Sequence, residues 1–223
     1  MYNEEAYVLR AVDAVRAALR EVGGGSHEIL IVDDASTDRT GTLADGIAES
    51  DPQVRVLHNE RNLTLGGTLR RGYAAATKEL VLYTDADLPF DLQELPRALW
   101  LLEYQQADVL AAYRFDRTSE GLLRTLYTLV YSAIIRTLFA LRLRDVNFSF
   151  KLFRRALLEK FELKSEGSFI DAEFLLRARK AGASIIQIGV DYFPRSRGVS
   201  TLASPRVILR LLREMTGLWR ELR

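Results

Sequence analysis

Residues 79–99 read ELVLYTDADLPFDLQELPRAL, and this order of residue types decides how the rest of the chain is interpreted. The strand-forming run 80–83 is followed directly by Asp85 and Asp87, and then by an amphipathic helical pattern. A short apolar run without alternation is typical of a parallel strand that is buried on both faces of its sheet. The stretch therefore predicts a strand-to-helix unit with two carboxylates at the carboxyl end of the strand.

A second acidic strand end lies upstream, in EILIVDDAS, where Asp33 and Asp34 follow an apolar run. Further strands are expected at 54–58, 108–114 and 183–193, and helices at 4–22, 39–49, 66–77 and 92–105. This alternation predicts an α/β fold with a mainly parallel, Rossmann-like sheet flanked by helices. Ligands of such sheets bind at the carboxyl ends of the strands, which is where all four aspartates fall.

Beyond residue 114 the pattern becomes mostly helical. Helices are expected at 121–143, 152–161 and 171–181, and the chain closes with an arginine-containing amphipathic helix at 204–222. We expect the segments 121–143 and 204–222 to face a membrane surface, although the apolar stripe of the last helix also fits packing against the domain. The whole chain, 1–223, is expected to form one domain.

Composition excludes several kinds of site. The chain has no cysteine and two histidines, His27 and His58, so thiol catalysis, cysteine-based zinc sites and a serine–histidine triad are not expected. Neither a signal peptide nor a spanning helix is expected, since no uncharged apolar run reaches about 18 residues. No nucleic-acid partner is expected either.

Charge is distributed unevenly along the chain. Residues 1–111 carry 10 basic and 19 acidic side chains, whereas residues 112–223 carry 21 basic and 11 acidic ones. The acidic half could hold a divalent cation and the basic half, which is rich in arginine, could hold anions. Chance distribution over a solvated surface is the simpler alternative.

Three chemistries use acids in such positions. ILIVDDAS and DADLP resemble the acid pair and the phosphoacceptor segment of a receiver domain, but a helix precedes the first strand and no Lys-Pro follows. A phosphatase of the haloacid dehalogenase type would need Thr or Val where Pro89 stands. The third chemistry is glycosyl transfer, in which a divalent cation held by two carboxylates stabilises a departing nucleoside diphosphate.

Five motifs, in order, resemble those of inverting glycosyltransferases of family two, and the last resembles polyprenol-phosphate sugar synthases of the dolichol-phosphate mannosyltransferase type. They are YNE at 2–4, VDDAS-x-D-x-T at 32–40, a glycine-containing loop at 62–72, TDAD at 84–87 and PRSRGVST at 194–201. The resemblance implies a GT-A fold. It also implies transfer of a hexose from a UDP- or GDP-linked donor to a polyprenyl phosphate at the cytoplasmic face of a membrane, with Mg²⁺ or Mn²⁺ as cofactor.

The resemblance also implies residue roles. The nucleotide-sugar would be bound by Tyr2, Asn3, Glu4, Asp33, Asp34, Asp85 and Asp87. Asp85 and Asp87 would hold the metal, with Asp87 and Arg195 as the catalytic pair. Arg114 and Arg124 would face the acceptor phosphate.

The chain departs from the family at its start, because members have a full strand before YNE. We therefore expect either a truncated sequence or a protein that lacks the first strand, and in both cases a neighbouring strand would be left unpaired. A hydroxyl acceptor remains an alternative, and would need a general base such as Asp171 or Glu173. A receiver-type switch and a descendant without catalytic activity are the alternatives outside this chemistry.

Overall fold

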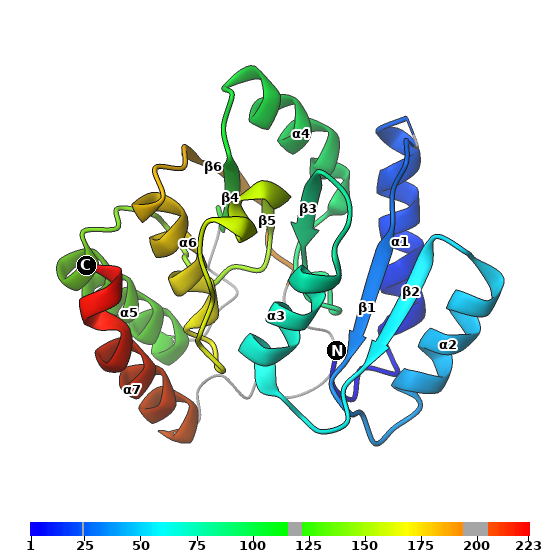
Figure 1. Ribbon diagram of the computed structural model, residues 1–223, viewed down its shortest axis with the longest axis horizontal. Coiled ribbons are helices and arrows are strands. Elements are labelled where there is room, and N and C mark those ends of the chain that lie inside the picture. Colours follow the sequence, from blue (N-terminus) through cyan, green and yellow to red (C-terminus); the bar gives the residue numbers. More distant parts are fainter. Residues whose placement is uncertain (24, 116–121, 194–204) are drawn as a thin grey trace.

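The computed structural model describes residues 1–23, 25–115, 122–193 and 205–223, with the side chains of 122–129 and 205–208 excepted. Helices and strands alternate through these ranges (Figure 1), which confirms the α/β fold class. The strands are β1 (Ile29–Asp33), β2 (Val54–His58), β3 (Leu80–Tyr83), β4 (Val109–Arg114), β5 (Lys151–Arg154) and β6 (Ile185–Val190). The helices are α1 (Val8–Glu21), α2 (Thr40–Ser50), α3 (Thr64–Ala75), α4 (Leu95–Tyr104), α5 (Leu122–Phe139), α6 (Ile170–Lys180) and α7 (Pro205–Leu222), with short 3₁₀ turns η1 (Leu92–Glu94) and η2 (Arg155–Glu159).

The described strands form two sheets. β1 and β2 pair in parallel, and the other sheet has the order β3-β5-β4-β6. β4 and β6 are parallel, but β5 runs antiparallel to both of its neighbours. The larger sheet is therefore mixed.

The helix expected at 152–161 is wrong, because residues 151–154 form β5 and only a 3₁₀ turn follows. Successive side chains of β5 point to opposite faces of the sheet: Leu152 packs in one hydrophobic cluster and Phe153 in another. A short apolar run is compatible with either element, and here pairing with two long-range neighbours decides for the strand.

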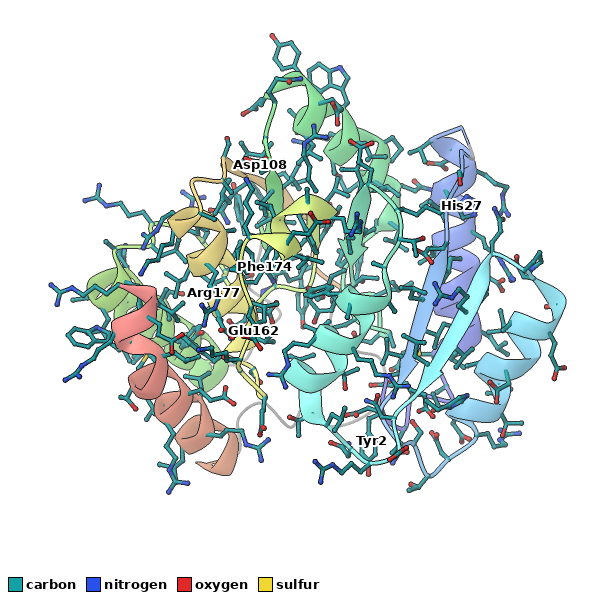
Figure 2. The ribbon with its side chains drawn as sticks, viewed as in Figure 1. Tyr2, His27, Asp108, Glu162, Phe174 and Arg177 are labelled. Carbon is teal, nitrogen blue, oxygen red and sulfur yellow. The ribbon has the colours of Figure 1, made fainter. Side chains whose placement is uncertain are left out.

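α7 packs against the domain along much of its predicted apolar stripe. Met215 and Leu222 are buried in the cluster that also contains residues of α6, and Glu221 accepts ion pairs from Lys164 and Arg177. Figure 2 shows Arg177 between α6 and α7. Leu209 and Leu212 of the same helix remain exposed. Within the described residues, no helix combines the length and the apolar character that crossing a bilayer requires.

A large cavity separates the two sheets. It measures about 1380 Å³ and is lined by β1, β3, α1 and α3. In Figure 1 β1 and β3 lie next to each other, but within the described residues no ladder joins them. Among the described residues, no further strand pairs with the edges of the two sheets that face this cavity.

Met1 makes one rung of a parallel ladder at the edge of β1. Its amine donates to the carbonyl oxygen of Val32 over 2.5 Å, and the amide of Asp34 donates to the carbonyl oxygen of Met1 over 2.7 Å. This reciprocal pattern sets Met1 opposite Asp33. Burial lowers the pKa of the Met1 amine, against the attraction of nearby carboxylates.

An added strand is expected to fill this cavity. About six apolar, strand-forming residues joined to the amine of Met1 would continue the rung along β1 and reach β3. We expect the melting temperature to rise by about 4–8 °C, which is about 2 kcal/mol for a chain of this size. Scanning calorimetry measures the change, and an extension of equal length made of Gly and Ser is the control. Equal melting temperatures for the two extensions would contradict this pairing.

Candidate active site

The amino-terminal segment lies beside the carboxyl ends of β1 and β3. Tyr2, Asn3 and Glu4 line the cavity together with Asp34 and Asp85. Figure 2 places Tyr2 at the end of the molecule where β1 and β2 finish. The structure therefore brings two of the predicted motifs, YNE and TDAD, to one cavity.

The loop between β1 and α2 holds the YNE segment in place through side chains of the VDDAS-x-D-x-T motif. Ser36 Oγ accepts the amide of Asn3 over 2.9 Å, and Thr40 Oγ1 accepts the amide of Glu4 over 2.8 Å. In return, Asn3 Oδ1 accepts the amide of Thr37 over 2.8 Å. Ser36 and Thr40 of this motif therefore hold the YNE segment, which lines the cavity.

Asp33 and Asp34 have different surroundings although they are adjacent in sequence. Asp34 lines the cavity, and its Oδ1 accepts the amide of Leu63 and the Nδ2 of Asn59, each over 2.7 Å. Its Oδ2 makes no hydrogen bond to any described residue, so this atom can receive a ligand. The predicted contact of Asp34 with the nucleotide-sugar stays a prediction.

Asp33 does not line the cavity. It accepts the amide of Ser36 over 3.2 Å and meets Nδ1 of His58 at 3.0 Å. Burial opposes its ionisation, but the hydrogen bonds from Ser36 and His58 outweigh burial and lower the pKa of Asp33. Asp33 thus holds the loop after β1 through Ser36 and meets the ring of His58. Its predicted contact with the nucleotide-sugar stays a prediction.

Asp85 and Asp87 lie on the tight turn after β3, where Leu88 has a φ of +44°. Tyr83 Oη donates to Asp85 Oδ1 over 2.9 Å. Burial, followed by the negative charges of Asp87 and Asp171, raises the pKa of Asp85. A bound cation would relieve this repulsion, and paired carboxylates are the oxygen donors that Mg²⁺ and Mn²⁺ prefer. The donor set therefore fits such an ion.

No three His, Cys, Asp or Glu side chains of the described residues are grouped closely enough to form a complete metal site. Asp85 and Asp87 alone would leave most positions on a divalent ion open. A diphosphate could fill some of these positions with its own oxygens.

A buried ion pair lies near these acids, and nothing in the sequence pattern singles it out. Lys151 Nζ meets Asp171 Oδ1 at 2.5 Å and donates to the carbonyl oxygen of Phe148 over 2.6 Å. The same ammonium lies 5.6 Å from the centre of the Tyr83 ring, whose hydroxyl holds Asp85. Burial raises the pKa of Asp171, although Lys151 opposes that rise. Asp171 lines the cavity.

Glu173, the other candidate for a general base, is fully buried and does not line the cavity. Its carboxylate accepts the amides of Lys164 and Ser165 and pairs with Arg177 at 2.7 Å. It therefore fixes the turn before α6, and Asp171 is the one of the two acids that a substrate in this cavity could reach.

Arg114 is tied to Asp145 by a two-pronged ion pair. Its Nε and Nη2 each lie 2.6 Å from a carboxylate oxygen of Asp145, and the guanidinium packs over Phe148 and Tyr192. These contacts fix the end of β4, and the predicted contact of Arg114 with the acceptor stays a prediction. The side chain of Arg124 and the whole of Arg195 lie outside the described residues.

Gly66 of the predicted glycine loop is needed for close packing. A Cβ at this position would lie 2.2 Å from the carbonyl oxygen of Ser165, and the Gly66 amide donates to the carbonyl oxygen of Glu166 over 2.7 Å. The glycine therefore allows α3 to begin directly against the turn that precedes α6.

Residues 1–161 match the sequence pattern described as glycosyl transferase family 2. The chain belongs to this family. The match covers both acidic strand ends and the YNE segment, and it shows that the protein is a glycosyltransferase. The receiver-type switch and the phosphatase are therefore set aside.

Curated relatives of this transferase share a little over a quarter of its sequence. Glycosyltransferase AglD of Haloferax volcanii is 27% identical over 200 residues, which are 87% of this chain but 32% of that protein. Polyprenol monophosphomannose synthase of Mycolicibacterium smegmatis is 28% identical over 224 residues, with coverage of 92% and 80%. Undecaprenyl-phosphate mannosyltransferase of Micrococcus luteus is 27% identical, with coverage of 91% and 84%. The transferase thus spans about a third of the first relative and most of the other two.

Solved structures support the fold. Glucosyl-3-phosphoglycerate synthase of Mycobacterium tuberculosis superposes with a TM-score of 0.69 at 21% identity, covering 96% of this chain and 76% of that one. The same enzyme with Mn²⁺, UDP-glucose and phosphoglyceric acid gives a TM-score of 0.68 at 20% identity, with coverage of 97% and 77%. The predicted GT-A-like fold is confirmed.

The contacts of His58 predict pH-dependent stability. Hydrogen bonds with Asp45 and then Asp33 raise the pKa of His58 above its usual value. Their stabilisation is fully present below the unfolded pKa of about 6.5 and is lost as pH rises through the higher folded value. His58→Gln should therefore lower the free energy of unfolding more at pH 5.5 than at pH 9, as measured by urea denaturation. His27→Gln is the control, and equal losses for His58→Gln at both pH values would contradict the assignment.

Proposed function

We propose that the transferase moves a hexose from a UDP- or GDP-linked donor to a polyprenyl phosphate, such as dolichyl phosphate, with a divalent cation and with inversion at the anomeric carbon. One observation supports the binding of a nucleotide-sugar donor. Asp34, Asp85 and the YNE segment line one cavity at the carboxyl ends of β1 and β3.

Each part of the donor then has a partner. The base and ribose would lie against Tyr2, Asn3, Glu4 and Asp34, while Asp85 and Asp87 would hold Mg²⁺ or Mn²⁺. The bound ion would neutralise charge that develops on the diphosphate as it leaves. Arg195, in the predicted late motif, would add positive charge to the same diphosphate.

The acceptor half is supported by the names of two relatives, which act on polyprenol phosphate and undecaprenyl phosphate. A phosphate monoester is anionic near neutral pH, so its oxygen can attack the anomeric carbon without a strong general base. The new bond joins that oxygen to the anomeric carbon, and the bond to the nucleoside diphosphate breaks. Arg114 and Arg124 are the predicted contacts of the acceptor phosphate.

We place the transferase at the cytoplasmic face of a membrane as a peripheral protein. Exposed apolar side chains on two helices support this placement: Val130 and Leu138 on α5, and Leu209 and Leu212 on α7. Arginines on α7 would contact anionic headgroups.

A transfer to a hydroxyl acceptor is the alternative, and it would require Asp171 as base. Asp171→Asn cannot take a proton. It also removes the charge that pairs with the buried Lys151, so transfer rates are compared per folded molecule, with the folded fraction measured by circular dichroism. For a phosphate acceptor we expect transfer to stay within about tenfold of the wild type, whereas loss of a general base costs about 10²- to 10⁴-fold. Radiolabelled sugar transfer to a short isoprenyl phosphate and to the matching alcohol measures both reactions. Preferred transfer to the alcohol, abolished by Asp171→Asn, would establish the alternative.

Nucleotide binding tests the donor half. UDP, GDP, UDP-glucose and GDP-mannose are each added with and without Mn²⁺ or Mg²⁺ in a thermal-shift assay. The cognate nucleotide near 100 times its Kd should raise the melting temperature by about 5–10 °C when metal is present.

The metal-dependent part of that shift should vanish in Asp87→Asn. Asp91→Asn is the matched control, because Asp91 lies on the same connection and its Oδ1 accepts the amide of Gln93 in the η1 turn. Equal shifts with and without metal in the wild type would disprove the metal assignment.

A further inference from the structure

On the side of α6 and α7 the cavity is lined by residues that no motif contains. They are Asn147, Gly167, Ser168 and Arg210, and they lie next to Asp171. Arg210 comes from α7, far along the chain from both acidic strand ends (Figure 1). The last helix therefore contributes a cation to a cavity whose other described charged residues are mostly acids.

Glu214 fixes α7 against the turn that precedes α6. Its Oε1 accepts the amide of Gly167 over 2.8 Å and the amide of Glu166 over 3.1 Å. The carbonyl oxygen of Glu166 in turn accepts the amide of Gly66 at the start of α3. Hydrogen bonds thus join the turn to α3 on one side and to α7 on the other. They fix the position of α7 along the turn.

This register places Arg210 at the cavity. Arg210 and Glu214 are four residues apart, so they share one face of α7. A Cβ at Gly167 would lie 3.0 Å from Cδ of Arg210 and 3.3 Å from the carboxylate of Glu214. The stem of Arg210 therefore crosses Gly167, where the absence of a side chain gives it room.

The guanidinium of Arg210 has no hydrogen bond or ion pair to any residue in the described part of the chain. Arg114 and Arg177 differ, because carboxylates occupy their guanidinium groups. A planar guanidinium that faces a cavity without a protein partner is suited to a two-pronged contact with a phosphate.

We propose that Arg210 binds the anionic group of the acceptor, an assignment that rests on the proposed function. The donor diphosphate belongs with Asp85 and Asp87 at the end of β3, whereas Arg210 approaches from α7. Its neighbours Leu209 and Leu212 are exposed on the same helix. One helix would thus offer a cation to the phosphate and apolar side chains to the isoprenyl chain.

Arg210→Gln tests this assignment in the full-length protein, with Arg213→Gln as the matched control on the next turn of α7. Both positions are exposed, so both variants should fold with wild-type melting temperatures. Isothermal titration with citronellyl phosphate, in the presence of Mn²⁺ and whichever of UDP and GDP binds, gives the Kd for an acceptor headgroup. Citronellol serves as the uncharged probe.

We expect Arg210→Gln to weaken citronellyl phosphate binding by about 10- to 100-fold, the loss typical of a hydrogen bond to a charged group. Arg213→Gln should stay within about twofold of the wild type, and so should the Kd of the metal–nucleotide pair in both variants. Equal weakening by the two substitutions, or no weakening by either, overturns the role of Arg210. So does a loss of nucleotide affinity in Arg210→Gln, because it would place the arginine on the donor. Wild-type protein that binds metal and nucleotide but neither binds citronellyl phosphate nor transfers sugar to it would instead refute the proposed acceptor class.

Discussion

The ion pair between Lys151 and Asp171 is the contact on which the arrangement of acids in the cavity depends. Both side chains are almost completely buried, at 1% and 4% exposure. Removing one partner would leave the other charge stranded, at a cost of about 3–5 kcal/mol. The same ammonium lies over the Tyr83 ring, and Tyr83 holds Asp85. One buried cation on β5 thus supports acids from α6 and from the end of β3, and it partly offsets their mutual repulsion.

Several residues of the sequence motifs form hydrogen bonds to other segments of the protein or pack against them. Ser36 and Thr40 hold the YNE segment, and Gly66 lets α3 approach the turn before α6. Of the acid pair after β1, Asp34 faces the cavity while Asp33 meets His58. A motif of this family therefore combines groups that are placed to meet a ligand with groups that hold the wall of its pocket.

The sequence predicts most of the fold because helix and strand periodicity is a local property. The acids at the strand ends were predictable for the same reason: an apolar strand followed by carboxylates needs only a few adjacent residues to recognise. The contacts of Lys151, Glu214 and Gly66 were not predictable, because the partner of each lies far along the chain. Asp33 could not be told from Asp34 either, since adjacent residues point in different directions only once the loop is built. β5 was missed because its short apolar run suits a helix equally well until its neighbours are in place.

The buried amine of Met1 has a practical consequence for handling the protein. Residues of an affinity tag joined to that amine would start at the edge of β1, beside the cavity between the two sheets. Tag residues could pair with β1 there as a surrogate strand and change both the stability of the protein and the shape of the adjoining cavity. Arg223, at the other end, is exposed beyond the last turn of α7. A handle joined to Arg223 would leave this edge of β1 as it is.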